Sequence, residues 1–153
     1  MKVQARLEPF GKVLLQTAIP TSFMGKVQLI QRLVRTLEQN GCVAGEAKYL
    51  AEICLDEALN NAIQHGNRGD PRKKISAVIF ADETRWGAII SDEGQGFNPR
   101  QIPDPRRDEN LLREGGRGIT LIENYVDELI YSEKGNQVML VKARAVDRQD
   151  LIP

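Results

Sequence analysis

Apolar residues recur with two different periods along this 153-residue chain, and the two periods predict strands and helices. Short apolar runs bounded by turn residues are typical of strands. Such runs lie at residues 12–19, 75–80, 85–91, 128–131 and 138–143, with a weaker one near residues 3–7. Apolar positions three and four residues apart predict helices instead. These helices lie at residues 23–39, 44–64 and 119–126.

Turn and capping residues support the element boundaries. Residues 20–22 (PTS) offer a helix start, residues 40–41 (NG) end that helix, and Gly66 suits the end of the next one. Residues 81–84 and 134–136 separate neighbouring strands closely enough to form hairpins. Because no internal repeat interrupts this order, the pattern predicts one α+β unit.

Length and charge narrow the possible function classes. A chain of 153 residues is long enough for one domain with a sizeable core and too short for two, so we expect a single domain over residues 1–153. Acidic and basic residues balance at 21 each, which argues against direct binding of nucleic acid or an anionic membrane. Residues 1–9 are mixed and charged, unlike a signal peptide, and no apolar run approaches a membrane span. We therefore expect a cytoplasmic protein.

The cysteine and histidine content favours neither a disulfide framework nor a zinc centre. Cys42 and Cys54 are the two cysteines, they form no Cys-x-x-Cys pair, and Cys54 falls on the apolar side of a predicted helix. They are best interpreted as reduced thiols. His65 is the sole histidine, which disfavours zinc.

A carboxylate and an amide lie four residues apart on the helix predicted at residues 44–64. That spacing places Glu57 and Asn61 on one helix face, at the border and at the margin of its apolar arc. A carboxylate can accept a proton from a hydroxyl, and an amide oxygen can bind Mg²⁺. The alternative is structural, with Asn61 bonded to nearby backbone and Glu57 a solvated charge.

The strand at residues 85–91 leads into an acidic, glycine-rich turn that reads DEGQG. Alternation places Asp92 on the same face as Trp86 and two further apolar residues, and so toward the interior. A semi-buried carboxylate requires a donor, which the exocyclic amine of adenine could supply. Gly94 and Gly96 would let the chain approach a flat ring closely. The alternative is an ordinary strand-to-loop turn with a solvated acid.

A second glycine segment, residues 115–118 (GGRG), opens the helix predicted at residues 119–126. Backbone N–H groups at a glycine-rich helix start can bind phosphates. The segment fits neither a dinucleotide-binding turn, because no strand precedes it, nor a Walker loop, which needs Gly-Lys-Ser/Thr. Before it, residues 97–115 form a long charged stretch with three prolines, a length typical of functional or mobile loops. The alternative is a flexible loop that leads into a helix.

The three motifs together resemble the ATP-binding boxes of one superfamily. Their order, Glu-x-x-x-Asn, Asp-x-Gly-x-Gly and Gly-x-Gly, is similar to the N, G1 and G2 boxes of the GHKL superfamily, which includes gyrase, heat-shock chaperone, histidine kinase and mismatch-repair ATPases. Residues 57–66 (EALNNAIQHG) and 116–127 (GRGITLIENYVD) resemble more narrowly the anti-sigma factor serine/threonine kinases, and the resemblance covers nearly the whole chain from about residue 19.

The resemblance implies a Bergerat fold, the histidine kinase-like ATPase fold. This is a two-layer α/β sandwich of the α+β class, with a mostly antiparallel mixed sheet covered on one face by about three helices. It also implies a role for each motif residue. Glu57 would be the general base, Asn61 would hold Mg²⁺, and Asp92 would bind the adenine amine of ATP. Gly94 and Gly96 would shape the base pocket.

The phosphate side of the site is implied by the same resemblance. Residues 97–115 would form the ATP lid, and Gly116 and Gly118 would pass close to the phosphates. Related kinases tend to carry an arginine in the lid that faces the terminal phosphate. The nearest candidates here are Arg113 and Arg117, of which we favour Arg113. The alternative is a purely solvated role for both.

Three functions remain open at this point. The first is a protein serine/threonine kinase that phosphorylates a small antagonist (anti-anti-sigma) protein and also binds a sigma factor, as a possible homodimer. The second is an ATP-dependent binding switch without transfer activity. The third is an ATPase or histidine-kinase-like module that acts on another partner. The third loses ground, because no phospho-acceptor helix or dimerisation domain is recognisable and the sole histidine lies inside the first motif. We expect the first, and a phosphoryl-transfer assay would separate it from the second.

Overall fold

A computed structural model of the protein describes residues 2–101 and 116–145. Its helices are α1 (Phe23–Gln39), α2 (Glu46–Asn61) and α4 (Gly116–Tyr125), with a π-helical turn at Ala62–Gly66 and a 3₁₀ turn at Pro99–Gln101. Its strands are β1 (Lys2–Gln4), β2 (Lys12–Pro20), β3 (Lys74–Ala81), β4 (Arg85–Ser91), β5 (Glu128–Ser132) and β6 (Gln137–Ala143).

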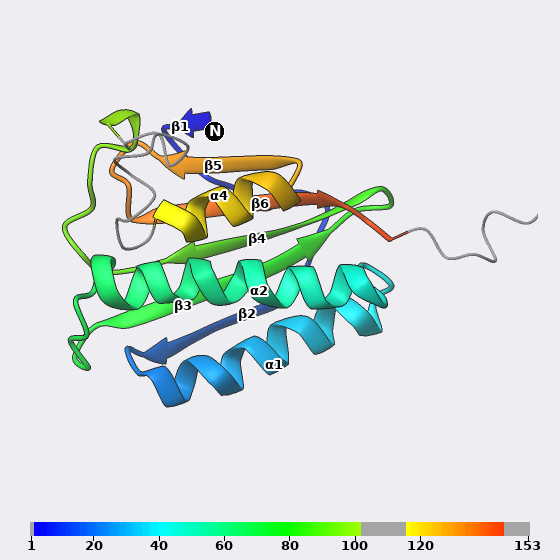
Figure 1. Cartoon of the computed structure of the whole chain (residues 1–153), viewed down its shortest axis with the longest axis horizontal. Coiled ribbons are helices and arrows are strands. Elements are labelled where there is room, and N and C mark those ends of the chain that lie inside the picture. The colour runs from blue at the N-terminus through cyan, green and yellow to red at the C-terminus, as the bar shows by residue number, and fades with distance from the viewer. Residues whose placement is uncertain (1, 102–115, 146–153) are drawn as a thin grey trace, which may run out of the picture.

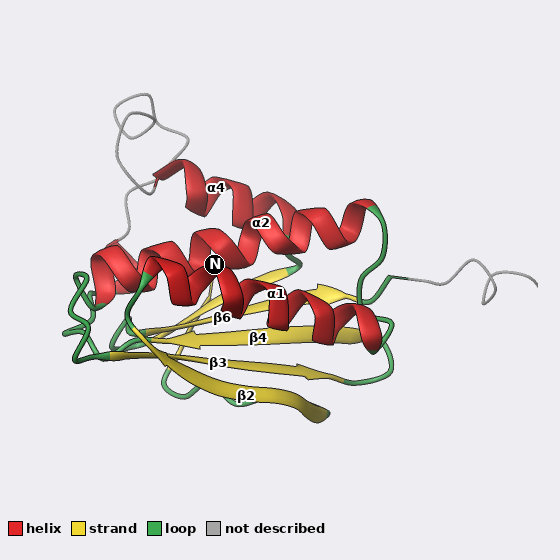
Figure 2. Ribbon diagram, turned by 90° about the horizontal axis from the view of Figure 1, so that it is seen from below, coloured by secondary structure: helices red, strands yellow, loops and turns green. Residues whose placement is uncertain are grey.

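The strands in these ranges form one six-stranded sheet in the order β1-β5-β6-β4-β3-β2. Each neighbouring pair is antiparallel except β1 and β5, which run parallel. In the centre of the sheet, Ile90 of β4 lies opposite Ala77 of β3 on one side and Val138 of β6 on the other. Figure 1 and Figure 2 show α1, α2 and α4 together on one face of the sheet. The predicted two-layer fold with a mixed, mostly antiparallel sheet is confirmed.

The larger hydrophobic core lies between the helices and the sheet. Alternation along β4 turns Trp86, Ala88 and Ile90 toward the helices, where all three are buried with the apolar residues of α1 and α2. Asp92 follows β4 in the same phase and packs against Gly66, the last residue of the π-helical turn. The face predicted for Asp92 is therefore confirmed.

A smaller core covers the opposite face of the sheet, and the N-terminal segment contributes to it. Leu7 is buried there, and Phe10 packs edge-on against Phe80 with ring centroids 4.8 Å apart. The strand predicted near residues 3–7 is instead β1, which ends at Gln4 after pairing with β5. Leu7 packs into this second core from outside the strand. Its apolar side chain therefore led to a strand prediction that ended too late.

Polar contacts join the first two helices, α1 and α2. The hydroxyl of Ser22 caps α1 by accepting a hydrogen bond from Gly25 N–H at 3.1 Å. One turn later, the Lys26 ammonium lies 2.8 Å from Asp56 Oδ1 and donates to Asn60 Oδ1 at 2.8 Å. Asp56 and Asn60 lie one turn apart on the same side of α2, so Lys26 holds that polar side of α2 against α1.

Element boundaries differ from the sequence predictions at two places. The helix predicted over residues 44–64 is α2 followed by the π-helical turn, which ends at Gly66. The helix predicted from residue 119 begins earlier, at Gly116. Of the lid predicted at residues 97–115, the part from 102 to 115 lies outside the described residues.

Two expectations drawn from composition concern the cysteines and membrane-spanning helices. Cys42 and Cys54 are free and buried, and burial raises the pKa of the Cys54 thiol to about 11, so this thiol stays protonated at neutral pH. Among the helices that the structure describes, none has the length and apolar character needed to cross a membrane.

Candidate functional site

Glu57 and Asn61 occupy the last two turns of α2, and the backbone of Asn61 is still helical at φ −62° and ψ −41°. Both side chains are half-buried, at the edge of the helix face that enters the core, as their angular positions predicted. Within the described residues, the side-chain hydrogen bonds of this helix end involve Asp56 and Asn60 and leave Glu57 and Asn61 without a partner. Neither the carboxylate nor the amide is therefore occupied by a hydrogen bond to another described side chain.

A π-helical turn, Ala62–Gly66, continues α2 toward the end of β4. The N–H of Asn67 closes this turn by donating to the carbonyl of Ala62 at 2.8 Å. Gly66 then lies so close to Asp92 that a Cβ atom on Gly66 would overlap the carboxylate. The end of the first motif and the start of the second are thus in direct contact.

Asp92 is half-buried beyond the end of β4, and a described donor bonds to one of its two carboxylate oxygens. Its Oδ1 accepts a hydrogen bond from Gly94 N–H at 2.8 Å, and no described residue donates to Oδ2. Burial raises the pKa of Asp92 above the usual range of an aspartate, against the lowering effects of the Gly94 hydrogen bond and of Lys73 and Lys134. A desolvated carboxylate with a free acceptor suits an N–H donor such as the adenine amine.

The turn after β4 packs against its neighbours without room for side chains. Gly94 lies against the carbonyl of Gly66, and Gly96, with φ +79°, lies against the carbonyl of Lys134. A Cβ atom on Gly94 or Gly96 would overlap that backbone. The N–H of Phe97 also donates to the Lys134 carbonyl at 3.0 Å. Both glycines singled out in the sequence are therefore required for close backbone packing here.

Asn67 is a site residue that the sequence analysis missed. Its side chain is only 1% exposed, and its Nδ2 donates to Thr21 Oγ1 at 2.8 Å and to the Lys74 carbonyl at 2.9 Å. Its Oδ1 accepts the N–H of Glu93 at 2.8 Å. One side chain thus ties the end of the first motif to the start of α1, to β3 and to the turn after β4. The available signal was a polar residue directly after the helix-ending Gly66.

The glycine segment lies at the same end of the molecule as the end of α2. Three predicted phosphate-site residues form the first turn of α4: Gly116, Arg117 and Gly118. Arg113 lies outside the described residues. The hydroxyl of Tyr125, at the end of α4, donates to the carbonyl of Ala47 near the start of α2 at 3.1 Å, so the two helices run antiparallel. Figure 1 accordingly shows the start of α4, the end of α2 and the end of β4 toward the same end of the molecule.

Three segments far apart in the sequence therefore converge at one end of the sheet: the end of α2, the turn after β4 and the start of α4. Within residues 2–101 and 116–145, no group of three or more His, Cys, Asp or Glu side chains could hold a metal ion alone. The amide oxygen of Asn61 is one possible protein ligand, and Mg²⁺ commonly binds through one or two protein oxygens together with phosphate oxygens and water. The residues present fit a metal–nucleotide pair.

Comparisons with known proteins agree with this arrangement. Residues 24–142 match a family model described as the histidine kinase-like ATPase domain, a span that contains all three motifs. The chain is also similar to the serine-protein kinase RsbW of Staphylococcus aureus strains JH9 and Newman, at 34% identity over 100 residues in each case. That alignment covers 60% of this chain and 63% of each relative, so the chain spans less than two thirds of the relatives' length. The superfamily predicted from the motifs is confirmed, and the chain belongs to the histidine kinase-like ATPase domain family.

Proposed function

We propose that this protein binds ATP and transfers its terminal phosphoryl group to a serine or threonine of a partner protein. The observation that supports this best is that the end of α2 with Glu57 and Asn61, the turn after β4 with Asp92, and the glycine-rich start of α4 lie toward the same end of the molecule. The family match and the similarity to relatives named serine-protein kinases favour the same chemistry.

Asp92 and the turn after it hold the adenine. The open Oδ2 of Asp92 accepts the exocyclic amine, which compensates the carboxylate for its desolvation. Gly94 and Gly96 shape the base pocket by letting the turn pack closely against Gly66 and Lys134. Because Gly66 fixes Asp92 against the end of α2, the adenine is positioned relative to the Glu57–Asn61 pair.

The phosphates lie between the ends of α2 and α4. Asn61 holds Mg²⁺ through its amide oxygen, and the ion neutralises charge on the phosphates when bound. Backbone N–H groups at Gly116 and Gly118 donate to phosphate oxygens at the start of α4. Arg113 or Arg117 supplies a further positive charge near the terminal phosphate, with Arg113 the favoured candidate.

Glu57 is the general base for the transfer. Its carboxylate takes the proton of the serine or threonine hydroxyl while that oxygen bonds to the terminal phosphorus. The bond from phosphorus to the bridging oxygen breaks in the same step, and ADP leaves with the electron pair. Positioning and charge neutralisation supply most of the catalysis, since phosphoryl transfer needs little covalent help from the protein.

The resemblance of residues 57–66 and 116–127 to anti-sigma factor kinases supports a specific pair of partners. The substrate is a small antagonist (anti-anti-sigma) protein, and the second partner is a sigma factor, bound by a single-domain protein that can form a homodimer. The balance of 21 acidic and 21 basic residues supports regulation through proteins without direct contact to nucleic acid. The setting that we propose is the cytoplasm.

The test incubates the protein with radiolabelled ATP, Mg²⁺ and candidate antagonist proteins. We expect label on a serine or threonine of one partner, lost in Glu57→Ala while ATP binding, measured by calorimetry, persists. Glu52→Ala is the matched control, because Glu52 is an exposed glutamate on the same helix. Transfer that survives Glu57→Ala would contradict the assigned base. Binding of ATP without transfer to any partner would favour an ATP-dependent switch.

A further inference from the structure

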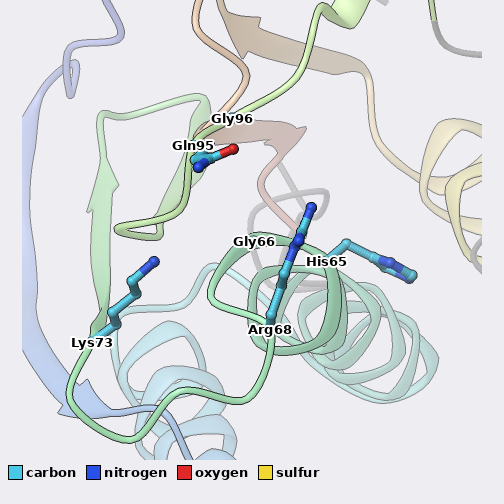
Figure 3. Close-up of a pocket in the computed structure, with 6 residues that line it drawn as sticks. All are labelled: His65, Gly66, Arg68, Lys73, Gln95 and Gly96. Carbon is cyan, nitrogen blue, oxygen red and sulfur yellow. The ribbon is translucent and has the colours of Figure 1, made fainter.

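A cavity of about 150 Å³ lies beside the end of α2. Six residues line it: His65, Gly66, Arg68, Lys73, Gln95 and Gly96 (Figure 3). This set includes neither Glu57, Asn61 nor Asp92, and none of the residues of α4. The cavity therefore adjoins the proposed nucleotide site at Gly66 and Gly96, and its described lining contains none of the side chains assigned above to the nucleotide.

Two cationic side chains line this cavity from different segments. Arg68 belongs to the turn that follows the π-helical turn, and Lys73 directly precedes β3. Figure 3 shows both side chains extending toward the turn that carries Gln95, while the His65 ring points away from them. The cavity thus combines a guanidinium, an ammonium and a side-chain amide, all of which can donate hydrogen bonds.

Neither Arg68 nor Lys73 forms a close ion pair among the residues that the structure describes, although Lys73 lies near enough to Asp92 to lower the pKa of that carboxyl. The ion pairs in those residues include neither side chain, and no acidic residue lines the cavity. Arg72, between them in the sequence, behaves differently: its guanidinium is 88% exposed and pairs with Asp70 at 3.0 Å. A bound anion would be attracted by both cations.

The backbone that carries Arg68 is held in place. Arg68 has φ +52°, in the left-handed region where glycine is usual and where a residue with a side chain costs about 1 kcal/mol or more. The N–H groups on either side fix this turn, since Asn67 donates to the Ala62 carbonyl and Gly69 to the Ile63 carbonyl, each at 2.8 Å. The guanidinium is therefore presented from a fixed turn in an unusual conformation.

We propose that this cavity binds a phosphate group. A tetrahedral oxyanion has enough acceptor oxygens for a guanidinium fork, an ammonium and an amide at once. A volume of about 150 Å³ has room for one such group with water. The phosphate is either free or carried by a phosphoserine of a protein, and the site does not depend on the function proposed above.

The test follows the backbone N–H signals of the full chain by NMR as inorganic phosphate is added, with and without ADP and Mg²⁺. The same titration is made with a serine peptide and with its phosphoserine form. We expect saturable shifts at Gly66, Arg68, Lys73 and Gln95 that persist with ADP present. Binding of inorganic phosphate alone would identify a free anion, and binding of the phosphopeptide alone would identify a protein-borne group.

Three variants separate the cavity from general surface charge. Arg68→Gly removes the guanidinium and suits the positive φ, so it should fold at least as well as the parent. Arg68→Gly and Lys73→Gln should each weaken phosphate binding about ten-fold or more, the usual size of a charge-assisted hydrogen bond. Arg72→Gln removes the same charge from the same loop and should leave binding unchanged.

Three results would overturn the proposal. The first is a phosphate response that does not saturate or that spreads over many lysines. The second is an effect of Arg72→Gln equal to that of Arg68→Gly. The third is loss of the response when ADP is bound, which would assign the phosphate to the nucleotide site. Because the titrations without ADP stand alone, a failure of the kinase assay would leave this test intact.

Discussion

Gly66 lies directly against the carboxylate of Asp92, so that a side chain on Gly66 would occupy the space of the Asp92 oxygens. This contact joins the end of the Glu-x-x-x-Asn motif to the start of the Asp-x-Gly-x-Gly motif. It thereby fixes the proposed adenine acceptor relative to the proposed Mg²⁺ ligand. The geometry of the site therefore depends on residue 66 having no Cβ atom.

We therefore expect Gly66→Ala to damage nucleotide binding. The added Cβ forces Asp92 to move and disrupts its hydrogen bond to Gly94, at a cost of about 1–3 kcal/mol in the free energy of unfolding. ATP affinity, measured by calorimetry, should fall as well. Gly69→Ala is the control, because φ is +72° there but no atom lies within 4 Å of the new Cβ. Its stability should fall with unchanged ATP affinity, and an equal loss of affinity would contradict the account.

Asn67→Ala should be one of the most destabilising polar substitutions in the chain. It leaves the Thr21 hydroxyl, the Lys74 carbonyl and the Glu93 N–H without a partner in a buried place. We expect a loss of about 2–4 kcal/mol in the free energy of unfolding, measured by urea denaturation. Asn98→Ala, at an exposed position after β4, should cost far less. A loss at Asn67 no larger than at Asn98 would show that the three bonds contribute little.

The raised pKa of Asp92 predicts that the free energy of unfolding decreases as the pH rises through that pKa. In the unfolded chain an aspartate loses its proton near pH 4, at about its usual pKa. The folded carboxyl holds the proton to higher pH, because burial disfavours the charge. Its contribution to stability is therefore complete at low pH and is lost as the pH rises through the folded pKa.

Urea denaturation of Asp92→Asn across this pH range tests the prediction. The variant has no carboxyl to titrate, so its stability relative to the parent should increase as the pH rises. Asp82 is the opposite control, because its hydrogen bonds to Thr84 and Arg85 lower its pKa. Asp82→Asn should lose stability relative to the parent as the pH rises. The same slope in both variants would contradict the burial argument.

Asn61→Ala should weaken Mg²⁺-dependent ATP binding far more than it reduces folding stability. The reason is that the Asn61 side chain is half-buried and has no hydrogen-bond partner among the described residues, so its removal breaks no hydrogen bond between them. Calorimetry with and without Mg²⁺ measures the first effect, and thermal melts measure the second. Equal losses in both would mean that Asn61 has a packing role.

Local patterns were sufficient to predict most of the architecture. Periodicity located α1, α2 and five of the strands, and alternation along β4 gave the correct face for Asp92. These predictions succeed because a buried strand or helix face leaves a regular apolar pattern in the sequence. The order of the strands, by contrast, depends on pairings such as β1 with β5 that no local pattern indicates.

The details of the site depended on long-range contacts. The bonds of Asn67 reach Thr21, Lys74 and Glu93, which the chain brings together only when folded. The π-helical turn at Ala62–Gly66 was also not predictable, because its sequence is compatible with an ordinary helix end. Arg68 and Lys73 likewise come to line one cavity only when the chain folds, because Arg68 lies in the turn after the π-helical turn and Lys73 lies directly before β3.

A crystal structure with a non-hydrolysable ATP analogue and Mg²⁺ tests the nucleotide site most directly. We predict the adenine amine on the carboxylate of Asp92, the metal on the amide oxygen of Asn61 and the phosphates at the start of α4. A nucleotide bound elsewhere, or a base that makes no contact with Asp92, would contradict the account.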